Sequence, residues 1–202
     1  STIEGGMICT DNQNVYEIAR SMRSHGLVRE FDDKKLKDKW VASNQDLNPE
    51  FIFAYPAYNV RNNEIGAIIG LNQLSRLDTM IEARNINHEY FINNLDSEKY
   101  FTDFKMIGSS NYAFNLILKK KDDKLFKKLT SLLDDKEIEY RRGSAGGGNQ
   151  LRQPYLKNIF PDKFYLKFKN TEHVHFYGMY IGNYPTLSKE NIDLIIKTVN
   201  SA

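Results

Sequence analysis

The chain has 202 residues, of which 41% are hydrophobic and 27% charged, a composition typical of a globular protein with a sizeable core. Its formal net charge is only +2, with 28 basic residues against 26 acidic ones, so we expect no nucleic-acid partner. The single cysteine, Cys9, excludes a disulfide scaffold, and no apolar run reaches the roughly 20 residues of a membrane helix. We therefore expect a cytoplasmic protein without a membrane partner.

The first elements are a short strand and a helix. Residues 7–10 form an apolar run that predicts a strand, and Asp11 or Asn12 is placed to cap a helix after it. The inner face of this helix should hold its apolar residues, Val15, Ile18, Ala19 and Met22. His25 lies beside Gly26, the stop signal. A histidine there is typical of stabilisation by the helix dipole, and a catalytic role is the alternative.

The central stretch is residues 56–77, which follow a charged excursion over residues 30–50 that Trp40 should fold back onto the protein. Its apolar residues recur at helical spacing: Ile65, Ile68, Ile69, Leu74 and Leu77. Asn59 and Arg61 precede the helix in an extended approach, and Asn62 or Asn63 can cap it. Polar side chains before a helix start suit a phosphate, because the first helical N–H groups are unpaired. The alternative is an ordinary buried helix after two surface residues.

The second half of the chain predicts an α/β arrangement. The helical pattern continues past Leu77 to Leu95, which predicts one long helix that could join two domains. Residues 112–118 alternate as a strand with one face inward, residues 125–133 form a helix, and Ile138 and Tyr140 start another strand. Strand, helix and strand within about 30 residues indicate an α/β unit on an open sheet.

A glycine-rich loop over residues 143–148 is flanked by three arginines, Arg141, Arg142 and Arg152. It lacks the Gly-Lys-Ser/Thr ending of a nucleotide P-loop. A flexible backbone with bidentate anion donors beside it suits a diphosphate or a sugar, and a mobile surface loop is the equal alternative.

His173 and His175 are expected on one face of a strand. Two imidazoles without a further Cys or carboxylate at ligand spacing do not make a zinc site, so we predict no metal. A last helix begins at a Ser188 cap.

Four motifs in register resemble one family, the DegT/DnrJ/EryC1/StrS sugar aminotransferases. They are Ser1-Thr2-Ile3-Glu4-Gly5-Gly6-Met7, Arg23-Ser24-His25-Gly26, Tyr58-Asn59-Val60-Arg61 and Gly66-Ala67-Ile68-Ile69-Gly70-Leu71-Asn72-Gln73-Leu74. The resemblance covers nearly the whole chain. It implies an α/β protein, the C-terminal part of a vitamin B6-dependent enzyme of fold type I. Residues 1–55 would end the large cofactor domain, 56–95 would be the linking helix region, and 96–202 the small domain.

The resemblance also implies the cofactor, the partners and the site. The cofactor would be pyridoxal 5′-phosphate or pyridoxamine 5′-phosphate, and the substrate a nucleotide-linked sugar. The family's asparagine at the place of Asn59 reaches across a homodimer to the cofactor phosphate, with Arg61 a second phosphate or substrate ligand. Tyr58 belongs to the substrate-binding set, with the three arginines of the loop. Ala57 departs from the family's usual glycine.

The family's cofactor-binding lysine would lie just before Ser1, so we expect the chain alone to be inactive. Most members transfer an amino group to a keto sugar; a minority are 3-dehydratases, in which histidine replaces that lysine. Ile3, where aminotransferases commonly have glycine, favours the dehydratases that act on a GDP-linked keto-deoxy sugar in O-antigen-type polysaccharide biosynthesis. The alternative from another class is a non-catalytic module that binds a sugar nucleotide or a partner.

Overall fold

The computed structural model describes residues 2–143 and 148–202. It divides into two compact units, Ser1–Ser75 and Arg76–Ala202. The division into three functional parts at residues 55 and 95 stays a prediction.

The first unit is built on three helices, α1 (Gln13–Met22), α2 (Lys34–Ala42) and α3 (Glu64–Leu74). Asn12 caps α1, because its side chain accepts the N–H groups of Asn14 and Val15. Asn63 caps α3 through the N–H of Gly66. Both helix starts are therefore those that the sequence predicted.

A small core holds the loops of this unit together. Val28, Phe31 and Ile52 are buried, and Trp40 packs against them with its ring edge-on to Tyr55 at 6.3 Å. The expectation that Trp40 folds back is confirmed.

Two expectations for this unit are wrong. Residues 7–10 form no strand; no ladder partner lies beside them in the described chain. The buried residues of α1 are polar, Glu17 and Ser21, whereas Val15, Ile18 and Met22 are 44%, 38% and 42% exposed. The buried polar groups find partners instead, since Ser21 donates to the carbonyl of Leu27 at 3.0 Å.

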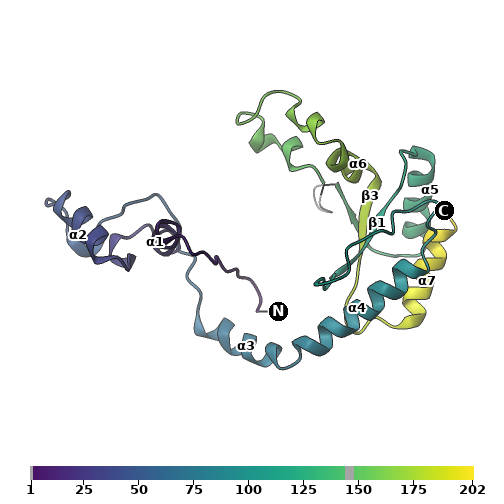
Figure 1. Cartoon of the computed structure of the whole chain (residues 1–202), viewed down its shortest axis with the longest axis horizontal. Coiled ribbons are helices and arrows are strands. Elements are labelled where there is room, and N and C mark those ends of the chain that lie inside the picture. Colours follow the sequence, from purple (N-terminus) through teal and green to yellow (C-terminus); the bar gives the residue numbers. More distant parts are fainter. Residues whose placement is uncertain (1, 144–147) are drawn as a thin grey trace. The chain divides into compact units, whose positions relative to one another are not determined.

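The second unit is an antiparallel sheet of three strands with helices packed on one face (Figure 1). The strand order is β1-β3-β2, and β3 pairs with both neighbours, so β1 and β2 run in the same direction. The strands and helices are β1 (Ala113–Ile117), β2 (Tyr140–Arg142), β3 (Gly178–Gly182), α4 (Leu77–Asn93), α5 (Asp123–Asp135), α6 (Lys169–Tyr177) and α7 (Lys189–Asn200).

Alternation along the strands separates a core face from an open face. Phe114 and Leu116 of β1 lie opposite Ile181 and Met179 of β3, and all four are buried against residues of α4, α5 and α7. The alternating strand over 112–118 and the α/β class are confirmed. Tyr180 and the residues opposite it, Asn115 and Arg141, lie on the other face, which is only partly covered.

Two further expectations for this half are wrong. The long helix is two helices: α3 ends at Leu74, Ser75 donates its hydroxyl to the carbonyl of Asn72, and α4 begins at Leu77. His173 and His175 lie in helix α6, not in a strand. The strand expected from Ile138 and Tyr140 is present as β2, which begins at Tyr140.

No group of three metal-ligating side chains occurs among the described residues. In the same part of the chain, no helix is both long and apolar enough to cross a membrane.

Candidate cofactor and substrate site

The backbone brings two of the four motifs side by side. Ser24 and Asn59 form an antiparallel bridge. The N–H of His25 donates to the carbonyl of Tyr58 at 3.0 Å, and the N–H of Val60 donates to the carbonyl of Arg23 at 2.8 Å. Residues far apart in the sequence therefore fix the extended approach to α3.

Arg61 is held in place by Ser24 of the second motif and by Glu30. Its Nε donates to Ser24 Oγ at 2.7 Å, a second guanidinium nitrogen also contacts that oxygen, and Nη2 lies 3.3 Å from Glu30 Oε1. Ser24 is fully buried, whereas the Arg61 side chain is 44% exposed. Ser24 and Glu30 thus fix the orientation of the guanidinium, and part of the guanidinium stays accessible to solvent. Sequence reasoning missed both Ser24 and Glu30 as partners, although Ser24 is in the motif.

The turn at the end of the Arg23–Gly26 motif has an unusual backbone. His25 has φ +62° and Gly26 has φ +77°. A Cβ on Gly26 would come within 2.0 Å of the carbonyl oxygen of Tyr55. A non-glycine residue in the left-handed region is uncommon, so the surrounding hydrogen bonds must hold His25 there. Its side chain is exposed and lies next to Ser24 in the chain.

The donors at this place fit the phosphate of a vitamin B6 cofactor. An amide on Asn59, which is exposed, and a positioned guanidinium on Arg61 are the side chains that bind a phosphate with direction. The N-terminus of α3 contributes less to phosphate binding than the sequence suggested. Asn63 already caps the N–H of Gly66, and the carboxylate of Glu64 occupies the first turn. The side chains, more than the helix dipole, would hold the phosphate.

The three arginines beside the glycine-rich loop do not converge. Arg141 lies opposite Tyr180 on the open face of the sheet, whereas Arg142 packs its guanidinium 4.6 Å from the ring centre of Phe126. Residues 144–147, the middle of the loop predicted for a diphosphate or sugar, lie outside the described residues.

Arg152 is engaged within the protein. Its Nε and Nη2 donate to the two oxygens of Glu172 at 2.8 and 2.5 Å, and its guanidinium lies between the rings of Tyr165 and Phe176. The Arg152 hydrogen bonds hold the pKa of Glu172 below its usual value. Burial lowers the pKa of His175, which accepts the N–H of Asn149 at 3.2 Å. This cluster anchors the end of the loop; a substrate role for Arg152 stays a prediction.

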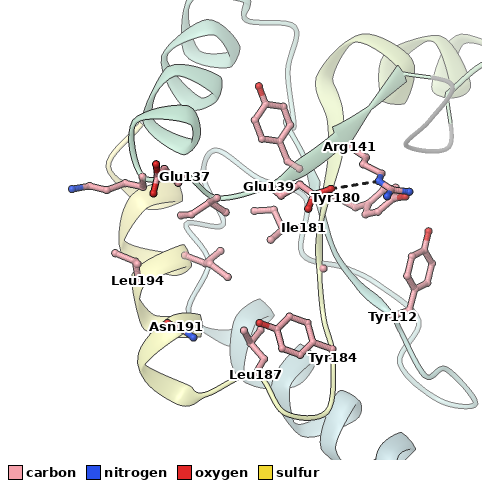
Figure 2. A pocket seen from close by; sticks show the side chains of 15 residues that line it. Tyr112, Glu137, Glu139, Arg141, Tyr180, Ile181, Tyr184, Leu187, Asn191 and Leu194 are labelled. Carbon is pink, nitrogen blue, oxygen red and sulfur yellow. Dashed lines mark ion pairs between the residues drawn. The ribbon is translucent and has the colours of Figure 1, made fainter.

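A cavity of about 630 Å³ opens where the chain before β2 separates from β3 (Figure 2). We call it the tyrosine cavity, after Tyr112, Tyr140, Tyr180 and Tyr184 in its lining. Arg141 Nε lies 3.9 Å from Glu139 Oε1 at its edge.

The tyrosines next to Arg141 are electrostatically linked to it. The rings of Tyr112 and Tyr180 meet edge-to-face at 5.5 Å. Hydrogen bonds from Tyr112 and then Arg141 lower the pKa of Tyr180. Sequence reasoning found Arg141 but not this cavity.

Comparison with known proteins decides the family. The profile of the DegT/DnrJ/EryC1/StrS aminotransferase family matches residues 1–200. The chain belongs to this family. The resemblance seen in the four motifs is thereby confirmed, and so is the fold that it implied.

The curated relatives include both chemistries. The GDP-4-keto-6-deoxy-D-mannose 3-dehydratase of Escherichia coli O55:H7 is 31% identical over 196 residues, 96% of this chain and 50% of the relative. The UDP-4-amino-4,6-dideoxy-N-acetyl-beta-L-altrosamine transaminase of Campylobacter jejuni is 26% identical over 121 residues, 58% of this chain and 28% of the relative. The chain spans about half the length of the dehydratase that it matches.

A solved structure gives the same assignment. It is a GDP-4-keto-6-deoxymannose-3-dehydratase with a trapped PLP-glutamate geminal diamine, matched with a TM-score of 0.70 and 30% identity over 98% of this chain and 51% of that one. The vitamin B6 cofactor expected from the resemblance is therefore the one bound in a structural neighbour.

Proposed function

We propose that this chain is part of a pyridoxal or pyridoxamine phosphate-dependent enzyme that acts on a nucleotide-linked keto-deoxy sugar, as a 3-dehydratase. The single observation that carries the proposal is the extent of the match. Nearly the whole chain aligns with a 3-dehydratase at 31% identity, whereas the transaminase match covers 58% at 26%. Ile3 in the first motif points the same way.

In this proposal the positioned donors bind the cofactor phosphate. Asn59 and Arg61 supply an amide and a guanidinium, and Ser24 and Glu30 orient the guanidinium. When bound, the cofactor withdraws electrons from the substrate carbon to which it is joined. Tyr58, 83% exposed, is placed beside Asn59 to contact the substrate. His25 is held next to Ser24 and is the candidate for a proton-transfer role. The working enzyme is a cytoplasmic homodimer whose site takes residues from both subunits.

The test uses the longest reading frame that contains this chain. The protein is incubated with pyridoxamine phosphate, glutamate and GDP-4-keto-6-deoxymannose, and the sugar product is identified by mass spectrometry and NMR. A dehydratase removes the C3 hydroxyl and leaves a keto sugar. A product that carries an amino group at C4 would show an aminotransferase and overturn the proposal.

The chain of 202 residues alone should be inactive in the same assay, because we place the residue that bears the reaction chemistry before Ser1. Conversion of the sugar by residues 1–202 would contradict this. The second candidate, a non-catalytic module, predicts no conversion by either protein while nucleotide binding persists.

A further inference from the structure

One stretch of the surface is much more basic than the rest of the chain. Residues 119–128, which form the turn after β1 and the first half of α5, contain six lysines and two aspartates. The whole chain has a net charge of only +2, so the remaining residues taken together are slightly acidic. All six lysines are exposed, and we call them the lysine patch: Lys119, Lys120, Lys121, Lys124, Lys127 and Lys128.

The lysines of α5 lie on the side of the helix that faces away from the core. The opposite side is buried and belongs to the helix layer with α7 (Figure 1); its residues are Phe126, Leu129 and Leu133. Lys124, Lys127 and Lys128 have the i, i+3, i+4 spacing that places side chains together on one side of a helix. The outer side of α5 is therefore basic from its first turn, directly after the three lysines that precede the helix.

The two aspartates of this stretch are bound to other groups. Asp122 Oδ1 accepts the N–H of Leu125 at 2.9 Å and caps α5. Asp123 Oδ1 accepts the hydroxyl of Tyr177 at 2.8 Å. Within residues 2–143 and 148–202, no ion pair joins a lysine of the patch to a carboxylate. The positive charge of the patch is therefore not neutralised by the described part of the chain.

The stability of α5 does not account for where these lysines lie. A helix is stabilised by acidic residues near its start and basic residues near its end, because of its dipole. In α5 three lysines follow Asp123 within the first two turns, whereas the last turn holds Asp134 and Asp135 and no basic residue. A partner of opposite charge outside the unit gives this arrangement a use.

The composition of the patch favours an extended anionic surface as that partner. A lysine is a compact point charge, whereas bidentate recognition of single phosphates is the property of arginine, which residues 119–128 lack. Arg142, which lies beside the patch, packs its guanidinium on the ring of Phe126. Phe126 is the one aromatic residue of the stretch and is 6% exposed, so it offers no face on which a nucleic-acid base could stack. Clusters of lysines are typical of surfaces that bind anionic lipid head groups.

We propose that the lysine patch binds the anionic head groups of a phospholipid bilayer and holds the protein reversibly at a membrane surface. The expectation of no membrane partner rested on the net charge of the whole chain and on the lack of a long apolar run. Neither property measures a local excess of lysine. The binding is electrostatic and peripheral, and it does not depend on the reaction that the enzyme catalyses.

The experiment measures binding of the 202-residue chain to vesicles by cosedimentation. One set of vesicles is phosphatidylcholine with about 30% phosphatidylglycerol, and the other is phosphatidylcholine alone. The patch variant precedes the helix and so leaves α5 intact: Lys119→Gln, Lys120→Gln and Lys121→Gln. The matched control removes three exposed lysines of α2, which alternate with aspartates in the sequence: Lys34→Gln, Lys35→Gln and Lys39→Gln.

We expect the unmodified chain to bind the anionic vesicles and not the neutral ones. The patch variant should bind the anionic vesicles about 100-fold more weakly, since each lysine near an anionic surface contributes roughly fivefold. The control variant should bind as the unmodified chain does. A rise in salt from about 50 mM to about 500 mM should release the protein, because the Debye length shortens. A second variant, Lys124→Gln with Lys127→Gln, should also weaken binding without lowering the melting temperature.

Three results would overturn the proposal. The first is no binding to anionic vesicles at low salt. The second is equal binding to neutral and anionic vesicles, which would show an apolar contact. The third is an equal loss of binding in the patch and control variants, which would show that net charge alone matters. Binding of duplex DNA that the patch variant removes, without binding of vesicles, would assign the patch to nucleic acid instead.

Discussion

Glu17 shows how a buried charge organises the first unit. The side chain is 2% exposed. Its carboxylate accepts the backbone N–H groups of Asp32 at 2.7 Å and Asp33 at 3.0 Å and the side-chain amide of Gln13 at 2.6 Å. Asp33 caps α2, so one carboxylate ties α1 to the start of α2. A buried acceptor with several donors is stabilising, and its removal leaves those donors unpaired.

Replacing Glu17 by alanine should therefore lower the free energy of unfolding by about 2 kcal/mol, the cost of unpaired buried donors. Urea denaturation followed by circular dichroism measures the loss. Glu50→Ala is the matched control, because Glu50 is exposed in the same unit, and it should change the stability little. Equal stability of the two variants would contradict the role given to Glu17.

His88 makes a pH-dependent contribution to the free energy of unfolding. It is 1% exposed, stacks with Phe114, and lies 2.8 Å through Nε2 from the side-chain amide nitrogen of Asn111. Burial lowers its pKa, as it does for His175. Because the unfolded chain binds the proton more readily, this stability is complete above a pH of about 6.5 and is lost as the pH falls below it toward the folded pKa.

We expect the free energy of unfolding to decrease between pH 7 and pH 5, and His88→Gln to flatten that decrease. Glutamine keeps an acceptor for Asn111 and does not titrate. The double variant of His88→Gln with His175→Asn should flatten the decrease in the free energy of unfolding further. Urea titrations at four pH values test this; parallel slopes for all variants would refute it.

Among the local elements, the turn after α1 is the one that positions the proposed site. The N–H of Gly26 donates to the carbonyl of Ser21 at 2.8 Å, and the carbonyl of Gly26 accepts the N–H of Ala54 at 2.7 Å. The backbone of Tyr55 occupies the space that a side chain would need. This turn also places Ser24 where its Oγ accepts a hydrogen bond from Arg61.

Gly26→Ala should destabilise the first unit by about 2 kcal/mol or more, because the left-handed backbone and the contact with Tyr55 both oppose a Cβ. It should also weaken cofactor binding by the longer protein. Gly6→Ala is the control, since nothing lies within 4 Å of a Cβ there. Thermal melts of the two variants, compared with the parent chain, check the difference; identical melting temperatures would contradict it.

The sequence predicted a helix start correctly where residues next to it in the chain determine it. It failed where packing against distant residues determines the structure. Asn12, Asn63 and Ser188 cap helices as expected, since capping is local. The face of α1 was wrong because periodicity shows that a face is apolar, not what covers it. His173 and His175 were misplaced because a short run with β-branched and aromatic neighbours does not separate a strand from a helix.

The sequence likewise predicted only part of the candidate site. Asn59 and Arg61 came from motif resemblance and the chemistry of phosphate donors. The partners Ser24 and Glu30, and the tyrosine cavity, depend on contacts between residues 31 to 69 positions apart. Such contacts follow from the fold, which no local pattern encodes.

Over the chain as a whole, exposed apolar side chains are concentrated on α3. No described residue of α3 is buried, although the sequence allowed an ordinary buried helix. Four large side chains are more than 60% exposed: Ile65, Ile68, Leu71 and Leu74. Gly66, Ala67 and Gly70 add small residues that permit close approach. A contiguous apolar surface of this kind marks an interaction site, so the chain should self-associate.

The double variant Ile68→Gln with Leu71→Gln should therefore shift the chain toward monomer, because the burial of apolar area drives association at roughly 25 cal/mol per Å². Sedimentation velocity over a concentration series measures the change. Ile107→Gln is the matched control, since Ile107 is 90% exposed on the other unit and loses the same apolar group. The control should associate as the parent chain does. A parent chain that stays monomeric at every concentration would remove α3 as an interaction surface, and an equal effect of Ile107→Gln would show that association does not depend on this helix.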